Sequence, residues 1–139
     1  MRKRLPAKVE SDRLVLRQWR ASDAEALGKA VLDSLDHLRP WMPWASLEPI
    51  AVADRTALIK WWRKERKAGR DSVIGILLGN EPIGSTGLHR RGPAALEIGY
   101  WIHVDHTGCG YATEASKALT TAAFGIRGIE QVQIQHDEA

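Results

Sequence analysis

The fold of this chain can be read from residues 97–124, EIGYWIHVDHTGCGYATEASKALTTAAF. The segment from Leu96 to Val104 is rich in aromatic and β-branched residues and has no proline, which is typical of a largely buried strand. Turn-forming residues follow, and from Tyr111 the apolar residues recur at helical spacing. The sequence therefore predicts a strand, a glycine-rich turn and a helix that begins near Gly110.

The predicted turn has the properties of an anion-binding site. The first amides of a helix have no partner within the helix, and the helix dipole adds partial positive charge there. Gly108 and Gly110 have no Cβ atom and Ala112 is small, so a diphosphate could approach the backbone closely. The patterns GxxxxGK[ST] and GxGxxG are absent from the sequence, which disfavours a Walker-type NTPase and a dinucleotide-binding start. Any strand that enters a helix through glycines looks alike, so the turn alone leaves a purely structural role open.

Three segments together resemble a known family. The run TGCGYA followed by TEA resembles the acyl-coenzyme A loop of the GNAT N-acetyltransferases, whose usual pattern is [QR]-x-x-G-x-[GA]. With the EIGYW strand and LRPWMPW upstream, residues 10–135 are most similar to the RimJ/RimL type, which acetylates protein N-termini and other amines. The resemblance implies an α/β fold with a central, mostly antiparallel sheet, flanking helices, and a last pair of parallel strands.

The resemblance also implies which residues hold acetyl-CoA, the co-substrate. Amides from Gly108 to Thr113 would hold the diphosphate, and backbone groups of the preceding strand would pair with the amide-rich pantetheine arm. The implied cofactor-binding residues are Ile102, His103, Val104, Thr107, Gly108, Cys109, Gly110, Tyr111, Ala112 and Thr113. Thr107 stands where arginine or glutamine is usual, and we expect coenzyme binding to be weaker or unchanged, because backbone amides make most of the cradle.

Glu97 is the candidate general base for acetyl transfer to an amine. Family members often use a glutamate on this strand to take the amine proton. Strand alternation puts Glu97, Gly99 and Trp101 on one face, so an acidic group, a gap and an aromatic wall point the same way. The alternative is a structural glutamate that pairs with Arg90 or Arg91.

Three further polar residues are weaker candidates. His103 alternates onto the face of Glu97 and could shuttle protons, although a backbone role beside the pantetheine arm is expected. Ser85 and Thr86 could hydrogen-bond a substrate, but their spacing does not single them out.

The segment HLRPWMPWA, residues 37–45, is predicted to be a stiff loop. Pro40 and Pro43 exclude a regular helix there. Trp41 and Trp44 are the predicted substrate-binding residues, because the corresponding segment lines the acceptor side in similar enzymes. A hydrophobic plug over the core is the alternative.

The remaining elements follow from local patterns. Residues 1–10 are expected to be a loose basic arm, and residues 11–139 a single GNAT-like domain. Ser22 is predicted to cap a helix that runs to about Ser34. The other predicted elements are strands at residues 13–19, 72–78, 82–88 and 131–135, with a second helix at residues 50–68.

Composition narrows the possible partners. The 139 residues, 44% of them hydrophobic, are enough for one domain with a core, and the net charge of +3 mildly favours acidic ligands. The basic run at residues 60–67 has no accompanying nucleic-acid-reading motif and also complements a helix dipole, so no nucleic-acid partner is expected.

Cys109 is the only cysteine, which excludes an internal disulfide and makes a reducing cytoplasm the expected setting. No base adjoins Cys109 in the sequence, so it is expected to be a bystander in the loop. His89, His106 and His136 form no metal-ligand pattern with it, and no metal is predicted. The start MRKRLPAKVE has no apolar run behind its basic residues, which predicts neither a signal peptide nor a membrane anchor.

The predicted function is acetyl transfer from acetyl-CoA to a primary amine, at a protein N-terminus or on a small molecule. In similar enzymes the chain continues past the last strand into a helix and a hairpin that often carries a tyrosine acid, whereas this sequence ends at Ala139. Tyr111 lies inside the loop and is not a substitute. The open edge of VQIQ predicts pairing into a homodimer. The alternative is therefore a truncated, inactive remnant that binds acetyl-CoA or self-associates.

Overall fold

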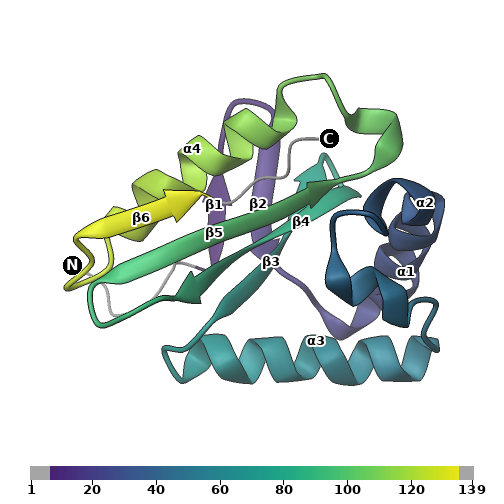
Figure 1. Ribbon diagram of the computed structural model, residues 1–139, viewed down its shortest axis with the longest axis horizontal. Coiled ribbons are helices and arrows are strands. Elements are labelled where there is room, and N and C mark those ends of the chain that lie inside the picture. The colour runs from purple at the N-terminus through teal and green to yellow at the C-terminus, as the bar shows by residue number, and fades with distance from the viewer. Residues whose placement is uncertain (1–6, 135–139) are drawn as a thin grey trace.

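Strands in chain order form one mixed sheet in the computed structural model, which describes residues 7–134 (Figure 1). The six strands of the described residues lie in the order β1-β2-β3-β4-β5-β6. Their bounds are β1 Lys8–Glu10, β2 Leu14–Gln18, β3 Ser72–Leu78, β4 Glu81–Arg90, β5 Ala95–Ile102 and β6 Gln131–Ile134. Neighbouring strands are antiparallel except β5 and β6, which are parallel. The predicted sheet, with its parallel last pair, is confirmed.

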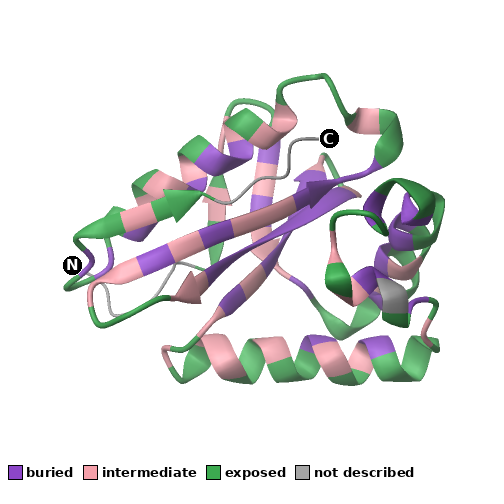
Figure 2. Cartoon of the chain, in the orientation of Figure 1, coloured by how far each residue is buried: buried purple, intermediate pink, exposed green. Residues whose placement is uncertain are grey.

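Helices cover both faces of this sheet. The parallel pairing of β5 and β6 accounts for the helix on one face. A parallel connection needs a crossover, and α4 (Tyr111–Phe124) supplies it between β5 and β6. The helices α1 (Ala24–Asp33), α2 (Leu35–Leu38) and α3 (Val52–Lys67) lie on the other side of the sheet (Figure 1). Alternation along β5 divides the core in the same way, because Leu96 and Ile98 pack with α4 whereas Trp101 packs with α1. Figure 2 shows buried residues concentrated on the inner strands β3, β4 and β5.

Several predicted boundaries need correction. Lys8–Glu10, which we assigned to the loose arm, form the edge strand β1, while residues 1–6 lie outside the described part. Ser22 does not cap a helix: it lies within a 3-10 turn, Ala21–Asp23, where the Asp23 carboxylate accepts the Arg20 amide at 2.7 Å. The strand predicted at residues 82–88 is longer than expected, because β4 runs from Glu81 to Arg90.

The strand predicted to end at Val104 ends at Ile102, and a 3-10 turn, Val104–His106, follows. His103 begins this turn and so leaves the strand alternation. Gln135, the last residue of the final predicted strand, lies outside the described residues, so β6 as described ends at Ile134. No helix among residues 7–134 has the length and apolar character to cross a membrane.

Candidate active site

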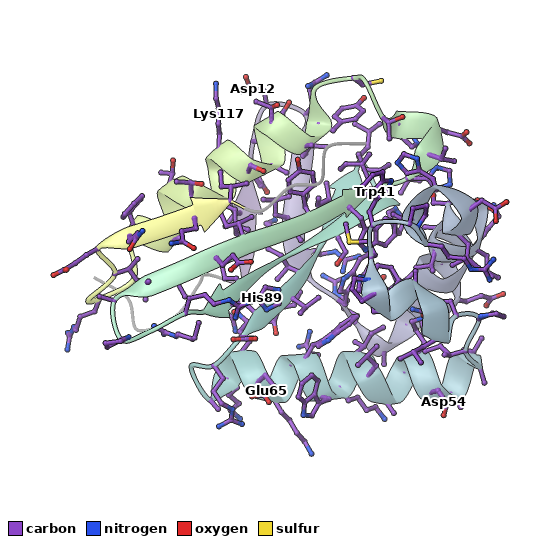
Figure 3. The ribbon with its side chains drawn as sticks, in the orientation of Figure 1. Asp12, Trp41, Asp54, Glu65, His89 and Lys117 are labelled. Carbon is purple, nitrogen blue, oxygen red and sulfur yellow. The ribbon has the colours of Figure 1, made fainter. Side chains whose placement is uncertain are left out.

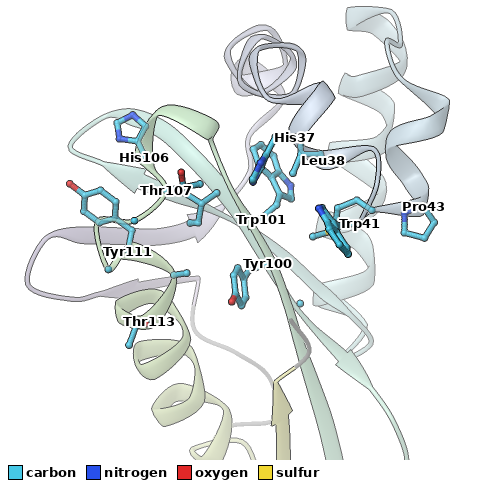
Figure 4. Close-up of a pocket in the computed structure, with 16 residues that line it drawn as sticks. His37, Leu38, Trp41, Pro43, Tyr100, Trp101, His106, Thr107, Tyr111 and Thr113 are labelled. Carbon is cyan, nitrogen blue, oxygen red and sulfur yellow. The ribbon is translucent and has the colours of Figure 1, made fainter. Parts of the chain in front are cut away.

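A cavity of about 550 Å³ lies where β5 ends and α4 begins, and we call it the loop cavity (Figure 4). One wall is the turn before α4, and the facing wall is the segment from α2 to Pro43, with Tyr100 of β5 between them. The lining includes seven of the ten residues predicted to bind a cofactor, namely Ile102, Thr107, Gly108, Gly110, Tyr111, Ala112 and Thr113. Trp41 lines it too.

The backbone of the turn is arranged to receive an anion. Gly108 and Gly110 have φ of +77° and +81°, which side-chain-bearing residues rarely adopt, and Gly110 is the N-cap of α4. The first helical hydrogen bond runs from the Glu114 amide to the Gly110 carbonyl at 3.0 Å. Within residues 7–134, the amides of residues 108–113 have no hydrogen-bond acceptor. A Cβ at Gly108 would meet open space, so an anion can reach these amides.

A guanidinium reaches the same turn from a distant part of the sequence. Arg13 Nη1 donates to the Cys109 carbonyl at 3.1 Å, and its Cζ lies 4.5 Å from the centroid of the Tyr111 ring. Arg13 Nε is 2.6 Å from Glu114 Oε1 on α4. Arg13 therefore places positive charge beside a loop in which Thr107 replaces the usual arginine or glutamine. Sequence reasoning missed this contact, because 101 positions separate Arg13 from Glu114.

Glu114 fixes the start of α4 to the segment before β2. The hydroxyl of Ser11, the Arg13 amide at 2.8 Å and the Arg13 guanidinium all donate to its carboxylate. These donors, with the Ser11 hydroxyl first among them, lower the pKa of Glu114 to about 2. Glu114 is therefore ionised throughout the neutral range, and its contacts hold the turn in place.

Two predicted cofactor residues are not available in the expected way. The His103 amide donates to the Ile83 carbonyl at 2.7 Å, and the Val104 amide donates to Ser34 Oγ at 3.0 Å. Their carbonyls accept from the His106 amide and Thr107 Oγ1. The two amides are therefore occupied within the protein, whereas each carbonyl keeps a second lone pair, and the role of these residues in cofactor binding stays a prediction.

In the adjacent part of β5, some backbone groups have no partner within residues 7–134. Alternate residues of an antiparallel strand direct their amide and carbonyl groups to opposite sides. The His103 amide points to β4, so those of Tyr100 and Ile102 point away from β4. The described pairing with β6 runs only from Ala95 to Ile98. Tyr100 and Ile102 both line the loop cavity.

The His103 side chain also differs from the prediction. Its Nε2 lies 3.1 Å from Asp33 Oδ2 at the end of α1, and its Nδ1 accepts from the Asp105 amide at 3.0 Å. The side chain is held by these two contacts and lines neither of the two cavities described here. His103 is therefore not on the face of Glu97, because the strand has already ended.

A second cavity of about 570 Å³ lies on the sheet face that α1 and α3 cover, and we call it the sheet cavity. Glu97, Gly99 and Trp101 all line it, which confirms that they share a face. Ser85, Thr86, His89 and Trp44 also line it. The two cavities share four residues, Met42, Gly99, Tyr100 and Trp101, so they meet across β5.

The two tryptophans that were predicted to bind substrate line different cavities. Trp41 lines the loop cavity, and Trp44 lines the sheet cavity with its ring centroid 6.1 Å from that of Trp101. Trp41 is 40% exposed, whereas Trp44 is partly buried against the α1–α3 core. The segment therefore forms walls of both cavities.

Glu97 has a partner at close range. Its Oε2 accepts from Arg91 Nε at 2.9 Å, and its side chain is only 17% exposed. This is the pairing given above as the structural alternative, but Glu97 still lines the sheet cavity. Its role as a base stays a prediction.

A histidine and an aspartate form another pair at this cavity. His89 Nδ1 lies 3.0 Å from Asp71 Oδ2, and Asp71 Oδ1 accepts the Arg90 amide at 3.0 Å. Although burial opposes the shift, the Arg90 amide and the His89 ring lower the pKa of Asp71. Figure 3 shows His89 projecting from the sheet toward the side of α3. The predicted strand ended at residue 88, so sequence reasoning missed the orientation of His89.

Among residues 7–134, no three His, Cys, Asp or Glu side chains gather where they could hold a metal ion. Cys109 is exposed and its thiol lies 3.7 Å from the Thr107 carbonyl.

Comparisons with known proteins agree with this geometry. Residues 13–139 match the model of the family described as "Acetyltransferase (GNAT) domain". A protein of Bacillus subtilis (strain 168), provisionally named as the ribosomal N-acetyltransferase YdaF, is 27% identical over 126 residues, which cover 89% of this chain and 69% of that protein.

Solved structures share the fold. The crystal structure of a "Probable acetyltransferase" has a TM-score of 0.84 at 26% identity, over 91% of this chain and 72% of that one. Mycobacterium smegmatis RimJ, solved with CoA-disulfide, has a TM-score of 0.74 at 27% identity, over 94% of this chain and 64% of that one. The fold of RimL, a ribosomal L7/L12 alpha-N-protein acetyltransferase solved with coenzyme A, matches with a TM-score of 0.81 at 23% identity, over 94% and 72%. The chain therefore belongs to the GNAT acetyltransferase domain family and is an acyl-CoA N-acyltransferase.

Proposed function

We propose that this protein transfers an acetyl group from acetyl-CoA to the α-amino group of a protein N-terminus, with a ribosomal protein as the acceptor. One observation carries the proposal: two cavities approach β5 from opposite sides and meet at Gly99, Tyr100 and Trp101. A donor in one cavity and an acceptor in the other would bring their reacting groups together at this junction.

The loop cavity fits acetyl-CoA. Amides of residues 108–113 lack partners within the described chain and match a diphosphate, whose charge the helix dipole and Arg13 also favour. The backbone groups of Tyr100 and Ile102, which have no strand partner on this side within residues 7–134, could pair with the pantetheine amides as an added strand would. A ligand held at both points would direct its thioester along β5 toward Gly99.

The sheet cavity fits an amine at the end of a polypeptide. Trp44 and Trp101 supply apolar walls, and Glu97 supplies the negative charge that attracts an ammonium group. A ribosomal acceptor is favoured because the names of YdaF and of RimL refer to ribosomal proteins. Such an acceptor would place the reaction in the cytoplasm, the setting expected from the single cysteine.

The test combines binding with turnover. Calorimetric titration with acetyl-CoA is followed by mass spectrometry of peptides that begin with Ser, Ala, Thr or Met, each compared with its N-terminally blocked form. We expect acetyl-CoA to bind and a mass gain of one acetyl group on free N-termini only. Acetyl-CoA binding without turnover on any amine would instead favour the non-catalytic alternative.

A further inference from the structure

His89 presents one ring nitrogen to the sheet cavity. Its Nδ1 is occupied by Asp71 at 3.0 Å, and within residues 7–134 its Nε2 has no hydrogen-bond partner. The carboxylate of Asp71 is an acceptor only, so it holds the proton of the neutral ring on Nδ1. The lone pair of Nε2 therefore faces the cavity that His89 lines.

Two glycines keep the space around this nitrogen open. A Cβ at Gly87 would lie 3.2 Å from His89 Nε2, and a Cβ at Gly99 would lie 4.0 Å from it. Gly87 cannot carry a side chain in any case, because its Cβ would be 2.9 Å from the Ser72 carbonyl. Gly99 lines both cavities. Nε2 of His89 therefore lies beside the junction where donor and acceptor would meet.

Glu97 is placed less favourably for proton transfer. His89 and Glu97 are direct cross-strand partners, but Oε2 of Glu97 is engaged by Arg91, whereas Nε2 of His89 is not engaged. Glu97 is suited to attract the cationic amine, and His89 is suited to receive its proton.

We infer that His89 is the general base of the acetyl transfer and that Asp71 is its positioning residue, an inference that rests on the proposed function. His89 Nε2 takes one proton from the acceptor ammonium, and the neutral amine attacks the thioester carbonyl carbon. The new C–N bond forms as the C–S bond breaks, and the second nitrogen proton leaves to solvent. The coenzyme departs as the thiolate, which solvent protonates.

Several charges surround this histidine and would shape the pH dependence. Asp71 contacts it from the segment before β3, and Glu97 and Arg91 approach from β5 and the turn before it. The buried ion pair between Arg55 and Glu48 lines the same cavity. Of these charged groups within residues 7–134, only Asp71 is hydrogen-bonded to the ring, so its removal is the sharpest second test.

The test measures kcat/KM between pH 5 and 9 with acetyl-CoA and a peptide that begins with serine. For His89→Gln we expect a loss of roughly 100- to 1,000-fold at pH 7 and no remaining acid limb, with an unchanged acetyl-CoA Kd by calorimetry. For Asp71→Asn we expect a loss of about tenfold and an acid limb moved to lower pH, because the protonated ring loses its carboxylate. Asp54→Asn, the same change at an exposed position on α3, should change neither quantity.

The outcomes distinguish a failure of the inference about His89 from a failure of the proposed function. A His89→Gln enzyme within threefold of the wild type, or one that keeps the acid limb, overturns the inference and leaves the proposed function standing. If His89→Gln does not fold, an Asp71→Asn profile identical to the wild type overturns it instead. A wild-type protein that binds acetyl-CoA but acetylates no amine overturns the proposed function and this inference together.

Discussion

The two cavities are built from different parts of the polypeptide. The loop cavity is lined by the turn before α4, and the backbone amides of residues 108–113 have no partner within residues 7–134. The sheet cavity presents side chains, which come from α1, α3, β3, β4 and β5 and the segment before α3. A backbone site needs little more than a strand, two glycines and a helix start. A side-chain site can be remodelled by single substitutions, so we expect acceptor specificity to reside there.

The largest effect should come from placing a negative charge at the backbone site. Ala112→Asp puts a carboxylate in the first turn of α4, where it suits the helix dipole but repels a diphosphate. We expect the acetyl-CoA Kd to rise about 100-fold at low salt, with a smaller rise at high salt. Calorimetric titration at two ionic strengths would measure it.

The matched control is Thr121→Asp, which adds the same charge to the exposed face of α4, two turns farther along. It should leave the Kd within about twofold, because Thr121 is more than two helical turns from the amides that would receive the diphosphate. An equal rise in both variants would mean that net charge, and not the amides, governs binding.

The glycine turn and the helix start beside the loop cavity were the part that sequence could predict. Gly108, Gly110 and the apolar spacing from Tyr111 are local signals, and each reports on its own few residues. The same holds for Glu97, Gly99 and Trp101, since strand alternation has a period of two. The predicted placement of the His103 side chain on the face of Glu97 was wrong, because alternation was continued one residue beyond the end of β5.

The remaining contacts depend on how distant segments are brought together. Asp71 and His89 are 18 positions apart and meet through the β3–β4 pairing, and Arg13 reaches Glu114 across 101 positions. No local pattern marks either pair, because each member alone is an ordinary surface residue. Trp41 and Trp44 line different cavities because of the path that residues 37–45 take beside β5, which no local pattern predicts.

Substitution of either tryptophan should have an intermediate effect, and each substitution should weaken the binding of a different ligand. Trp41→Ala removes a wall of the loop cavity and should raise the Kd of acetyl-CoA by about tenfold, a loss of about 1.4 kcal/mol. Trp44→Ala removes a wall of the sheet cavity and should raise the peptide KM by a similar factor. Titration of acetyl-CoA and steady-state kinetics on the peptide would be run on both variants. If both changes affected the same ligand, the assignment of separate cavities would fail.

The smallest effect concerns the contacts that hold the backbone site in place. The pKa of Glu114 is about 2 in the folded protein and 4.5 in its unperturbed state. A lowered folded pKa stabilises the protein fully above the unfolded value, and this contribution is lost as the pH falls from about 4.5 to 2. Glu114→Gln should therefore be less stable than the wild type at pH 7 and approach it near pH 2.

Urea unfolding at several pH values would measure this change, and acetyl-CoA titration at pH 7 would accompany it. The unfolding midpoint of Glu114→Gln should depend less on pH between 4.5 and 2, and its Kd should rise only a few-fold, because the amides themselves remain. Glu130→Gln, at an exposed position away from the turn, is the matched control and should follow the wild type. A Glu114→Gln protein that loses stability at pH 7 but keeps its Kd would separate the two roles: the Ser11, Arg13 and Glu114 contacts would stabilise the fold, while the glycines alone would set the direction of the amides.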